Sequence, residues 1–172
     1  RTPVNVYQLA EEVVKELGLM VADGTVELRV VGNRSAVAWA DGRRLRQLLT
    51  NLATNAVKAT VQGVVQLEIS KDDKMVVIAV IDSGTGISQE GLQSIFQPYQ
   101  QAGDHTQRRQ GEGLGLAISR RLALLHGGSL DVTSELGVGS RFVVRLPDET
   151  RSKFFPRDSL VPWLDGPEAS SA

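Results

Sequence analysis

Apolar residues recur along this chain at two spacings, one typical of amphipathic helices and the other of strands. The longest helical pattern runs from Gly42 to about Thr60, where leucines and alanines return every three or four residues. Asp41 stands immediately before it, where a side-chain oxygen can accept hydrogen bonds from the first turn. Shorter patterns predict helices across the segment YQLAEEVVKELGL with Gly18 as a stop, around 90–96, and over 114–126.

Strands are expected where β-branched and apolar residues alternate or run together between turn residues. The runs VVQLEIS and KMVVIAVID are joined across Asp72 and Asp73 and predict a hairpin, and SLDVTS and SRFVVRL predict a second hairpin through ELGVG. TVELRVV and AVAWA predict two earlier strands. Strands that follow one another in pairs imply a mixed, mostly antiparallel sheet with helices on one face, which is an α+β two-layer sandwich.

The regular pattern ends near Pro147. Residues 148–172 hold three of the six prolines and show no sustained period, so we expect one domain over 1–147 and a tail or linker over 148–172. A polar stretch between Gln97 and Gln110 is long enough to predict a functional loop or lid. The length of 172 residues suits a single domain with a sizeable core.

Composition excludes several classes of function. A formal net charge of -1 gives no reason to expect a nucleic acid or an anionic membrane as partner. The absence of cysteine rules out disulfides, thiolate metal sites and cysteine nucleophiles, and two histidines speak against a histidine-ligated metal centre. No apolar run is long enough to span a bilayer and no signal-peptide pattern opens the chain, so we expect a cytoplasmic location, with a parent protein that can still be membrane-attached.

A polar stripe follows one face of the long predicted helix. Asn51, Asn55 and Lys58 lie at i, i+4 and i+7, within an arc of about 60°, while the leucines occupy the neighbouring arc. Carboxamide oxygens beside an ammonium group suit Mg²⁺ together with phosphate. A solvated helix face is the alternative interpretation of the same three residues.

Two glycine-rich segments are candidates for ligand contact. In DSGTGI, Asp82 ends an apolar strand, where its carboxylate can accept a hydrogen bond from an exocyclic amine, and Gly84 and Gly86 permit close backbone approach. A plain turn after a strand is the alternative. In QGEGLGLAIS, three glycines precede a helix whose free N–H groups favour phosphate, although the spacing fits neither a dinucleotide fingerprint nor a P-loop.

Taken in order, these motifs resemble the catalytic and ATP-binding domain of sensor histidine kinases, within the GHKL ATPase superfamily. The resemblance covers about Val4 to Pro147. The long helix with Asp41 is similar to the N box, DSGTGI to the first glycine box, FQPY to the F box, and GEGLGLAIS to the second glycine box. GVGSRFVVRLP is similar to the closing strand of that domain.

The resemblance implies a Bergerat-type fold that binds ATP with Mg²⁺ between the long helix and a lid. It assigns Mg²⁺ to Asn51 and Asn55, phosphate to Lys58, catalysis to Asn51 and Lys58, and the adenine amine to Asp82. The residues that it assigns to ATP binding are Asn51, Asn55, Lys58, Asp82, Gly84, Gly86, Ile87, Arg108, Arg109, Gly111, Gly113, Leu114, Gly115, Leu116 and Ser140.

One position separates branches of the superfamily. Hydrolysing members carry Glu where Asn51 stands, as general base for water, and this helix has no carboxylate. The resemblance therefore implies transfer of the γ-phosphoryl of Mg-ATP to a histidine. That histidine would lie on a dimerising helical hairpin absent from this chain, without which the domain would be inactive, and a response regulator would act downstream.

Two other functions remain open at this stage. One is a stand-alone GHKL protein kinase that acts on Ser or Thr, like the anti-sigma-factor kinases. The other is a non-catalytic nucleotide-sensing or docking module, in which Glu112 places an unfavourable negative charge near the phosphates.

Overall fold

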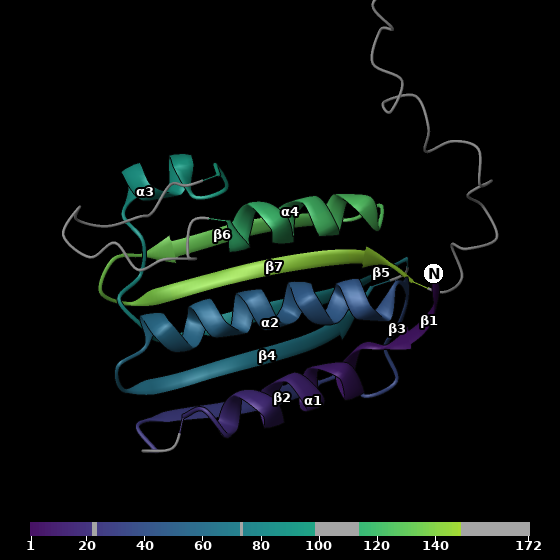
Figure 1. Cartoon of the computed structure of the whole chain (residues 1–172), viewed down its shortest axis with the longest axis horizontal. Coiled ribbons are helices and arrows are strands. Elements are labelled where there is room, and N and C mark those ends of the chain that lie inside the picture. The colour runs from purple at the N-terminus through teal and green to yellow at the C-terminus, as the bar shows by residue number, and fades with distance from the viewer. Residues whose placement is uncertain (22–23, 73, 99–113, 149–172) are drawn as a thin grey trace, which may run out of the picture.

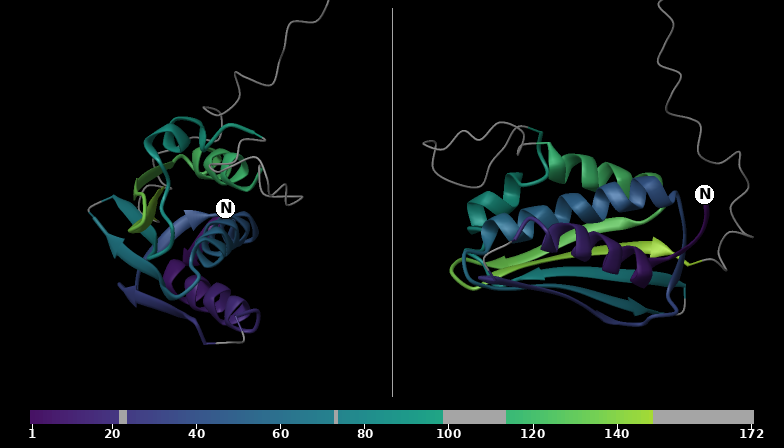
Figure 2. Two further views of the ribbon diagram at one scale, coloured as in Figure 1. Left: turned by 90° about the vertical axis from the view of Figure 1, so that its left-hand side faces the viewer. Right: turned by 60° about the horizontal axis from the view of Figure 1, so that its bottom comes forward.

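A five-stranded sheet carries a layer of helices on one of its faces (Figure 1). The computed structural model describes residues 1–21, 24–72, 74–98 and 114–148. Seen from the side, the helices lie on the same side of the sheet (Figure 2). The predicted α+β two-layer sandwich is therefore confirmed. Among the described residues, no helix has both the length and the apolar character needed to cross a membrane.

The sheet is mixed, as the sequence predicts. Its strands lie in the order β2-β4-β5-β7-β6, and only β2 and β4 pair in parallel. Both predicted hairpins form, as β4–β5 and β6–β7. The strands are β2 (Val26–Gly32), β4 (Gly63–Lys71), β5 (Met75–Asp82), β6 (Ser129–Glu135) and β7 (Gly139–Pro147).

A second, two-stranded sheet departs from the prediction. β3 (Val37–Ala40) forms where a strand is expected, but it pairs with β1 (Thr2–Asn5) instead of joining the main sheet. β1 carries no alternating pattern and includes Pro3, which stands opposite Trp39. Ala38 also bridges to Asp148, which is buried although the sequence assigns it to the tail.

The helices follow the predicted segments closely. α2 (Gly42–Ala59) is capped by the Asp41 side chain, which accepts a hydrogen bond from the Arg44 N–H at 3.0 Å. The other helices are α1 (Val6–Gly18), α3 (Gln89–Ser94) and α4 (Gly115–Leu125).

The core lies between α2 and the sheet. Leu45, Leu48, Leu49 and Leu52 of α2 are completely buried, as their spacing predicts. They pack with the residues of β5 that face the helices, among them Ile78 and Val80. Because the leucines occupy this arc of the helix, the polar stripe of α2 is turned away from the sheet.

Candidate functional site

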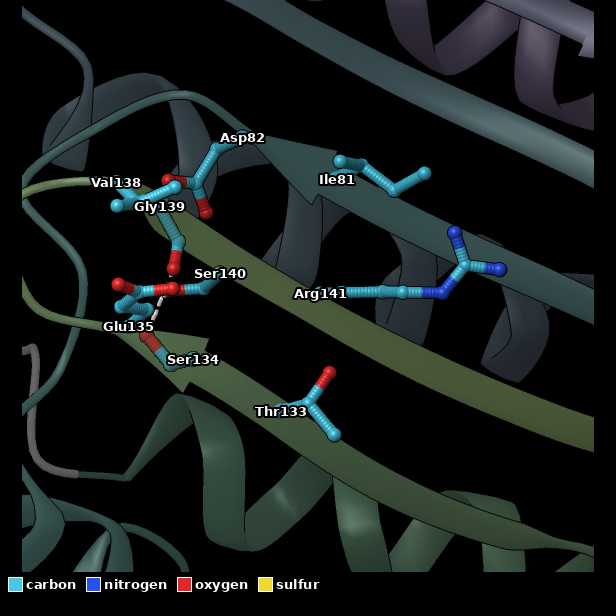
Figure 3. A pocket seen from close by; sticks show the side chains of 9 residues that line it. All are labelled: Ile81, Asp82, Thr133, Ser134, Glu135, Val138, Gly139, Ser140 and Arg141. Atoms are coloured by element: carbon cyan, nitrogen blue, oxygen red, sulfur yellow. Dashed lines mark hydrogen bonds between the residues drawn. The ribbon is translucent and has the colours of Figure 1, made fainter.

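Three polar side chains form a row across the sheet at the end of β5. In the strand register, Asp82 of β5 stands opposite Ser140 of β7, and Ser140 stands opposite Ser134 of β6 (Figure 3). All three face the helix layer, since they alternate regularly with core residues such as Val80 and Phe142 along their strands. The row therefore lies at the end of the sheet where the glycine-containing loop follows β5.

Asp82 is almost completely buried, with 5% of its surface exposed. Its Oδ1 accepts a hydrogen bond of 2.9 Å from the backbone N–H of Gly84. Burial raises the pKa of the Asp82 carboxyl above its usual 3.8, and the backbone N–H groups of Gly84 and Ser140 oppose that rise. A buried carboxylate with few donors around it is well suited to accept a hydrogen bond from a ligand.

The hydroxyl of Ser134 is a site feature that the sequence analysis missed. Its Oγ accepts a hydrogen bond of 2.8 Å from the N–H of Ile87, and it donates one of 2.9 Å to the carbonyl of Gly139. The Oγ of Ser140 lies 2.9 Å away. Only the register of the β6–β7 hairpin brings these groups together, so no spacing within the sequence could have indicated them.

Gly84 and Gly86 make room for the chain's own backbone. A Cβ at Gly84 would collide with the carbonyl of Ala59 at the end of α2. A Cβ at Gly86, whose φ is +68°, would collide with the carbonyl of Glu135 at the end of β6. The loop after β5 is thereby fitted between α2 and the β6–β7 hairpin.

The polar stripe of α2 reaches the start of α4. Asn51 and Asn55 are half-buried, Lys58 is exposed, and the Nδ2 of Asn51 donates a hydrogen bond of 3.5 Å to the carbonyl of Gly115. This contact, made through the amide nitrogen, leaves the Oδ1 of Asn51 as an acceptor. The structure thus brings together the long helix and the helix that follows the second glycine-rich segment.

The first turn of α4 has no side-chain cap. Leu114 occupies the N-cap position without a side-chain hydrogen bond, and Leu116 packs against the core. Free N–H groups at a helix start favour a negatively charged ligand. They lie next to Asn51 because Gly115 contacts that side chain.

Part of the predicted site lies outside the described residues. Arg108, Arg109, Gly111 and Gly113 belong to this part, and so does Glu112. On either side of that segment, the guanidinium of Arg120 in α4 stands 5.0 Å from the ring centre of Phe96. This cation–π contact links the residues before the segment to the helix after it.

A shallow hollow of about 390 Å³ opens at this end of the sheet and extends to its outer face, away from the helices (Figure 3). Its lining includes the row of Asp82, Ser140 and Ser134 together with Ile81, Thr133 and Arg141, which alternate with the row along their strands. Arg141 also forms an ion pair of 3.7 Å with Glu68 on this outer face. The row that faces the helix layer therefore also borders this hollow.

The acidic and histidine side chains of the described residues do not form a metal site, since no three of them cluster. The amide of Asn51 offers an oxygen donor beside the start of α4, and Asn55 follows it one turn later on α2.

Comparison with known sequences identifies a family and several relatives. Residues 40–150 match the family described as Histidine kinase-, DNA gyrase B-, and HSP90-like ATPase. The circadian input-output histidine kinase CikA of Synechococcus elongatus is 38% identical over 154 residues, which cover 86% of this chain and 20% of CikA. The aerobic respiration control sensor protein ArcB of Escherichia coli is 48% identical over 133 residues, covering 73% of this chain and 17% of ArcB. The chain thus spans about a fifth of the length of these relatives.

Two solved structures are also similar to this chain. The catalytic domain of histidine kinase ThkA, in a nucleotide-free form, aligns with a TM-score of 0.74 and 26% identity, covering 85% of this chain and 96% of that domain. Full-length ShkA in complex with AMPPNP aligns with a TM-score of 0.74 and 33% identity, covering 86% of this chain and 31% of ShkA.

Proposed function

Because this chain belongs to the family of histidine kinase-, DNA gyrase B- and HSP90-like ATPases and has the fold of a histidine kinase catalytic domain, we propose that it binds Mg-ATP for phosphoryl transfer to a protein histidine. The observation that carries the proposal is the contact between Asn51 and Gly115. It joins the amide of Asn51 to a helix start with free N–H groups, and the row that includes Asp82 faces the same helix layer from the end of the sheet.

The base of the nucleotide is assigned to the two buried residues of the row, Asp82 and Ser140. The carboxylate of Asp82 accepts a hydrogen bond from the exocyclic amine of adenine, and Ser140 lies beside it on the neighbouring strand. The phosphates are assigned to the start of α4, including Leu114 and Gly115, and to Lys58 of α2. The remaining predicted contacts, among them Ile87, Leu116, Arg108, Arg109, Gly111 and Gly113, stay predictions.

The α2 stripe fits a magnesium ion by its donor chemistry. Asn51 and Asn55 offer neutral amide oxygens, which Mg²⁺ accepts alongside phosphate oxygens and water. When bound, the ion neutralises phosphate charge. The two amides themselves hold the nucleotide in one orientation relative to α2.

The absence of a carboxylate from α2 favours phosphoryl transfer over hydrolysis. The sequence of α2 contains neither Asp nor Glu, so it offers no general base that could activate water. Phosphoryl transfer needs less from the protein, because positioning and charge neutralisation supply most of the catalysis.

An apolar strip on α4 supports a helical partner for this domain. Leu114, Ile118 and Leu125 are large apolar residues that remain exposed, at the helical spacing of four and then seven residues. Such a strip fits the apolar face of a helix, which we assign to the phosphoacceptor hairpin of the parent protein. A response regulator is then the expected acceptor of the phosphoryl group from that hairpin.

Calorimetry tests nucleotide binding. The 172-residue chain should bind ADP in the presence of Mg²⁺, and Asn55→Ala should weaken that binding. Gln47→Ala changes an exposed residue about two turns further back on the same helix and should bind like the parent. Absence of binding by the parent chain would refute the proposal.

Transfer to histidine needs a second experiment. The chain is incubated with γ-labelled ATP and a separately produced hairpin fragment of the parent protein. Label on that fragment should be lost in acid and retained in base, as expected for phosphohistidine. Acid-stable label on Ser or Thr would contradict histidine as the acceptor and would favour the stand-alone Ser/Thr kinase instead.

A further inference from the structure

The hydroxyls of Ser134, which is half-buried, and Ser140, which is buried, take part in a connected set of contacts that only one order of donors and acceptors satisfies. The Oγ of Ser134 is in contact with the N–H of Ile87, the carbonyl of Gly139 and the Oγ of Ser140. A hydroxyl has one proton to donate, a carbonyl can only accept, and a backbone N–H can only donate. All three contacts can be hydrogen bonds at once only if Ser134 gives its proton to Gly139 and accepts from Ile87.

The direction of the third contact follows from the first two. Because the only proton of Ser134 is used on the Gly139 carbonyl, the hydrogen bond between the two hydroxyls is satisfied only if Ser140 donates it. The Oγ of Ser140 then has no proton left for a ligand, and toward a ligand it can act only as an acceptor. Its neighbour in the row, Asp82, is also an acceptor.

We propose that Ser134 is a positioning residue that orients the Ser140 hydroxyl as an acceptor and thereby makes the site select a 6-amino purine over a 6-oxo purine. The inference rests on the proposed function, because it assumes that the base lies against Asp82 and Ser140. A purine with an exocyclic amine presents N–H donors to these two acceptors. A purine with an oxygen at the same position presents a third acceptor, which neither residue can satisfy.

The test compares ADP with inosine diphosphate, which carries oxygen in place of the amine and lacks the 2-amino group of guanine. Calorimetry on the full chain with Mg²⁺ gives the ratio of the two dissociation constants. In Ser134→Ala the Ser140 hydroxyl becomes free to turn its proton toward the oxygen of inosine. We expect the preference for ADP to fall about three- to tenfold, the effect of one net hydrogen bond.

Two further variants separate this role from a structural one. Ser134→Thr keeps the hydroxyl and should keep the parent ratio. In a Ser140→Ala background, adding Ser134→Ala should leave the ratio unchanged, because no hydroxyl remains there to be turned. Thermal melting of each variant, compared with the parent, reports any loss caused by the unsatisfied Ile87 N–H.

The outcomes are distinguishable. If Ser134→Ala weakens ADP and inosine diphosphate by the same factor, Ser134 only supports the structure and the inference is wrong. The inference is also wrong if Ser134→Ala changes the ratio of the two dissociation constants equally in the parent and in the Ser140→Ala background. If the parent chain does not bind ADP at all, the proposed function fails and the inference fails with it, whereas binding with an unchanged ratio refutes the inference alone.

Discussion

The ring of His126 accepts, at Nε2, a hydrogen bond of 3.1 Å from the backbone N–H of Asp41. Its Nδ1 lies 2.7 Å from the Leu122 carbonyl, and since a carbonyl can only accept, Nδ1 carries the proton and the ring is neutral. Asp41 caps the start of α2, and His126 ends α4. The two helices are thus joined here and again where Asn51 meets Gly115.

The neutral state of His126 predicts a loss of stability in acid. Burial lowers the pKa of His126 below its usual 6.5; the nearby Arg1 adds to this, whereas the Leu122 carbonyl and the negative charge of the Asp41 carboxylate oppose it. The unfolded chain therefore takes up a proton on this residue at a pH where the folded chain does not. The resulting stability is fully present above pH 6.5 and is lost as the pH falls toward the lowered pKa of the folded state.

Urea unfolding measured between pH 8 and pH 5 checks this prediction. The free energy of unfolding should fall over this range in the parent and fall less in His126→Gln, which can still accept from Asp41 but does not titrate. His105→Gln, which alters the other of the two histidines, separates the contributions of the two residues. An equal pH dependence in the parent and in His126→Gln would contradict a neutral, buried His126.

Asp82→Asn should separate stability from nucleotide binding. Burial disfavours the Asp82 carboxylate, and the amide oxygen of Asn can still accept from Gly84, so the variant should be at least as stable as the parent at pH 7. ADP affinity should fall by about ten- to hundredfold, because a hydrogen bond to a charged acceptor is lost. Chemical unfolding and calorimetry measure the two effects. A variant that binds ADP like the parent would remove Asp82 from the proposed adenine contact.

Local sequence patterns predicted those elements whose causes are themselves local. α2 could be predicted because its cap and its leucine spacing lie within one segment, and the Bergerat-type sandwich implied by the motif order is confirmed. β1 could not be predicted. It consists of four residues without alternation, and it is a strand only because β3 pairs with it. The parallel pairing of β2 with β4 likewise depends on tertiary packing.

The candidate site residues also divide into those that a local motif indicates and those that depend on strand register. Asp82 and Asn51 could be proposed from the sequence because each stands in a recognisable motif, and their roles stay predictions. Ser134 was missed because its importance arises from strand register, which sets it opposite Ser140 and within reach of the Ile87 N–H. The roles of Arg108 and Arg109 stay predictions, since both lie outside the described residues.

A core substitution in α2 should test the helix–sheet packing. Leu49 is completely buried, and Leu49→Ala should lower the free energy of unfolding by about 2–5 kcal/mol through lost burial and a residual cavity. Leu124→Ala is the matched control on α4, where the side chain is 54% exposed, and it should change stability by less than about 0.5 kcal/mol. Urea titration measures both, and similar losses in the two variants would contradict the assigned core.

Gly86→Ala should disturb the loop after β5 far more than the same change at Gly137. Both glycines have positive φ, +68° and +81°, so each alanine suffers the strain of a left-handed backbone, about 1–2 kcal/mol. Gly137 has open space around it, whereas a Cβ at Gly86 would collide with the Glu135 carbonyl. A backbone carbonyl cannot move aside as a flexible side chain can, so the free energy of unfolding of Gly86→Ala should fall by about a further 1–3 kcal/mol.

Gly86→Ala should also weaken ADP binding, because the loop that follows Asp82 must shift. Gly137→Ala should leave ADP binding unchanged. Urea titration and calorimetry on both variants decide the matter, and equal effects on stability and binding would show that the contact between Gly86 and Glu135 does not hold the loop in place.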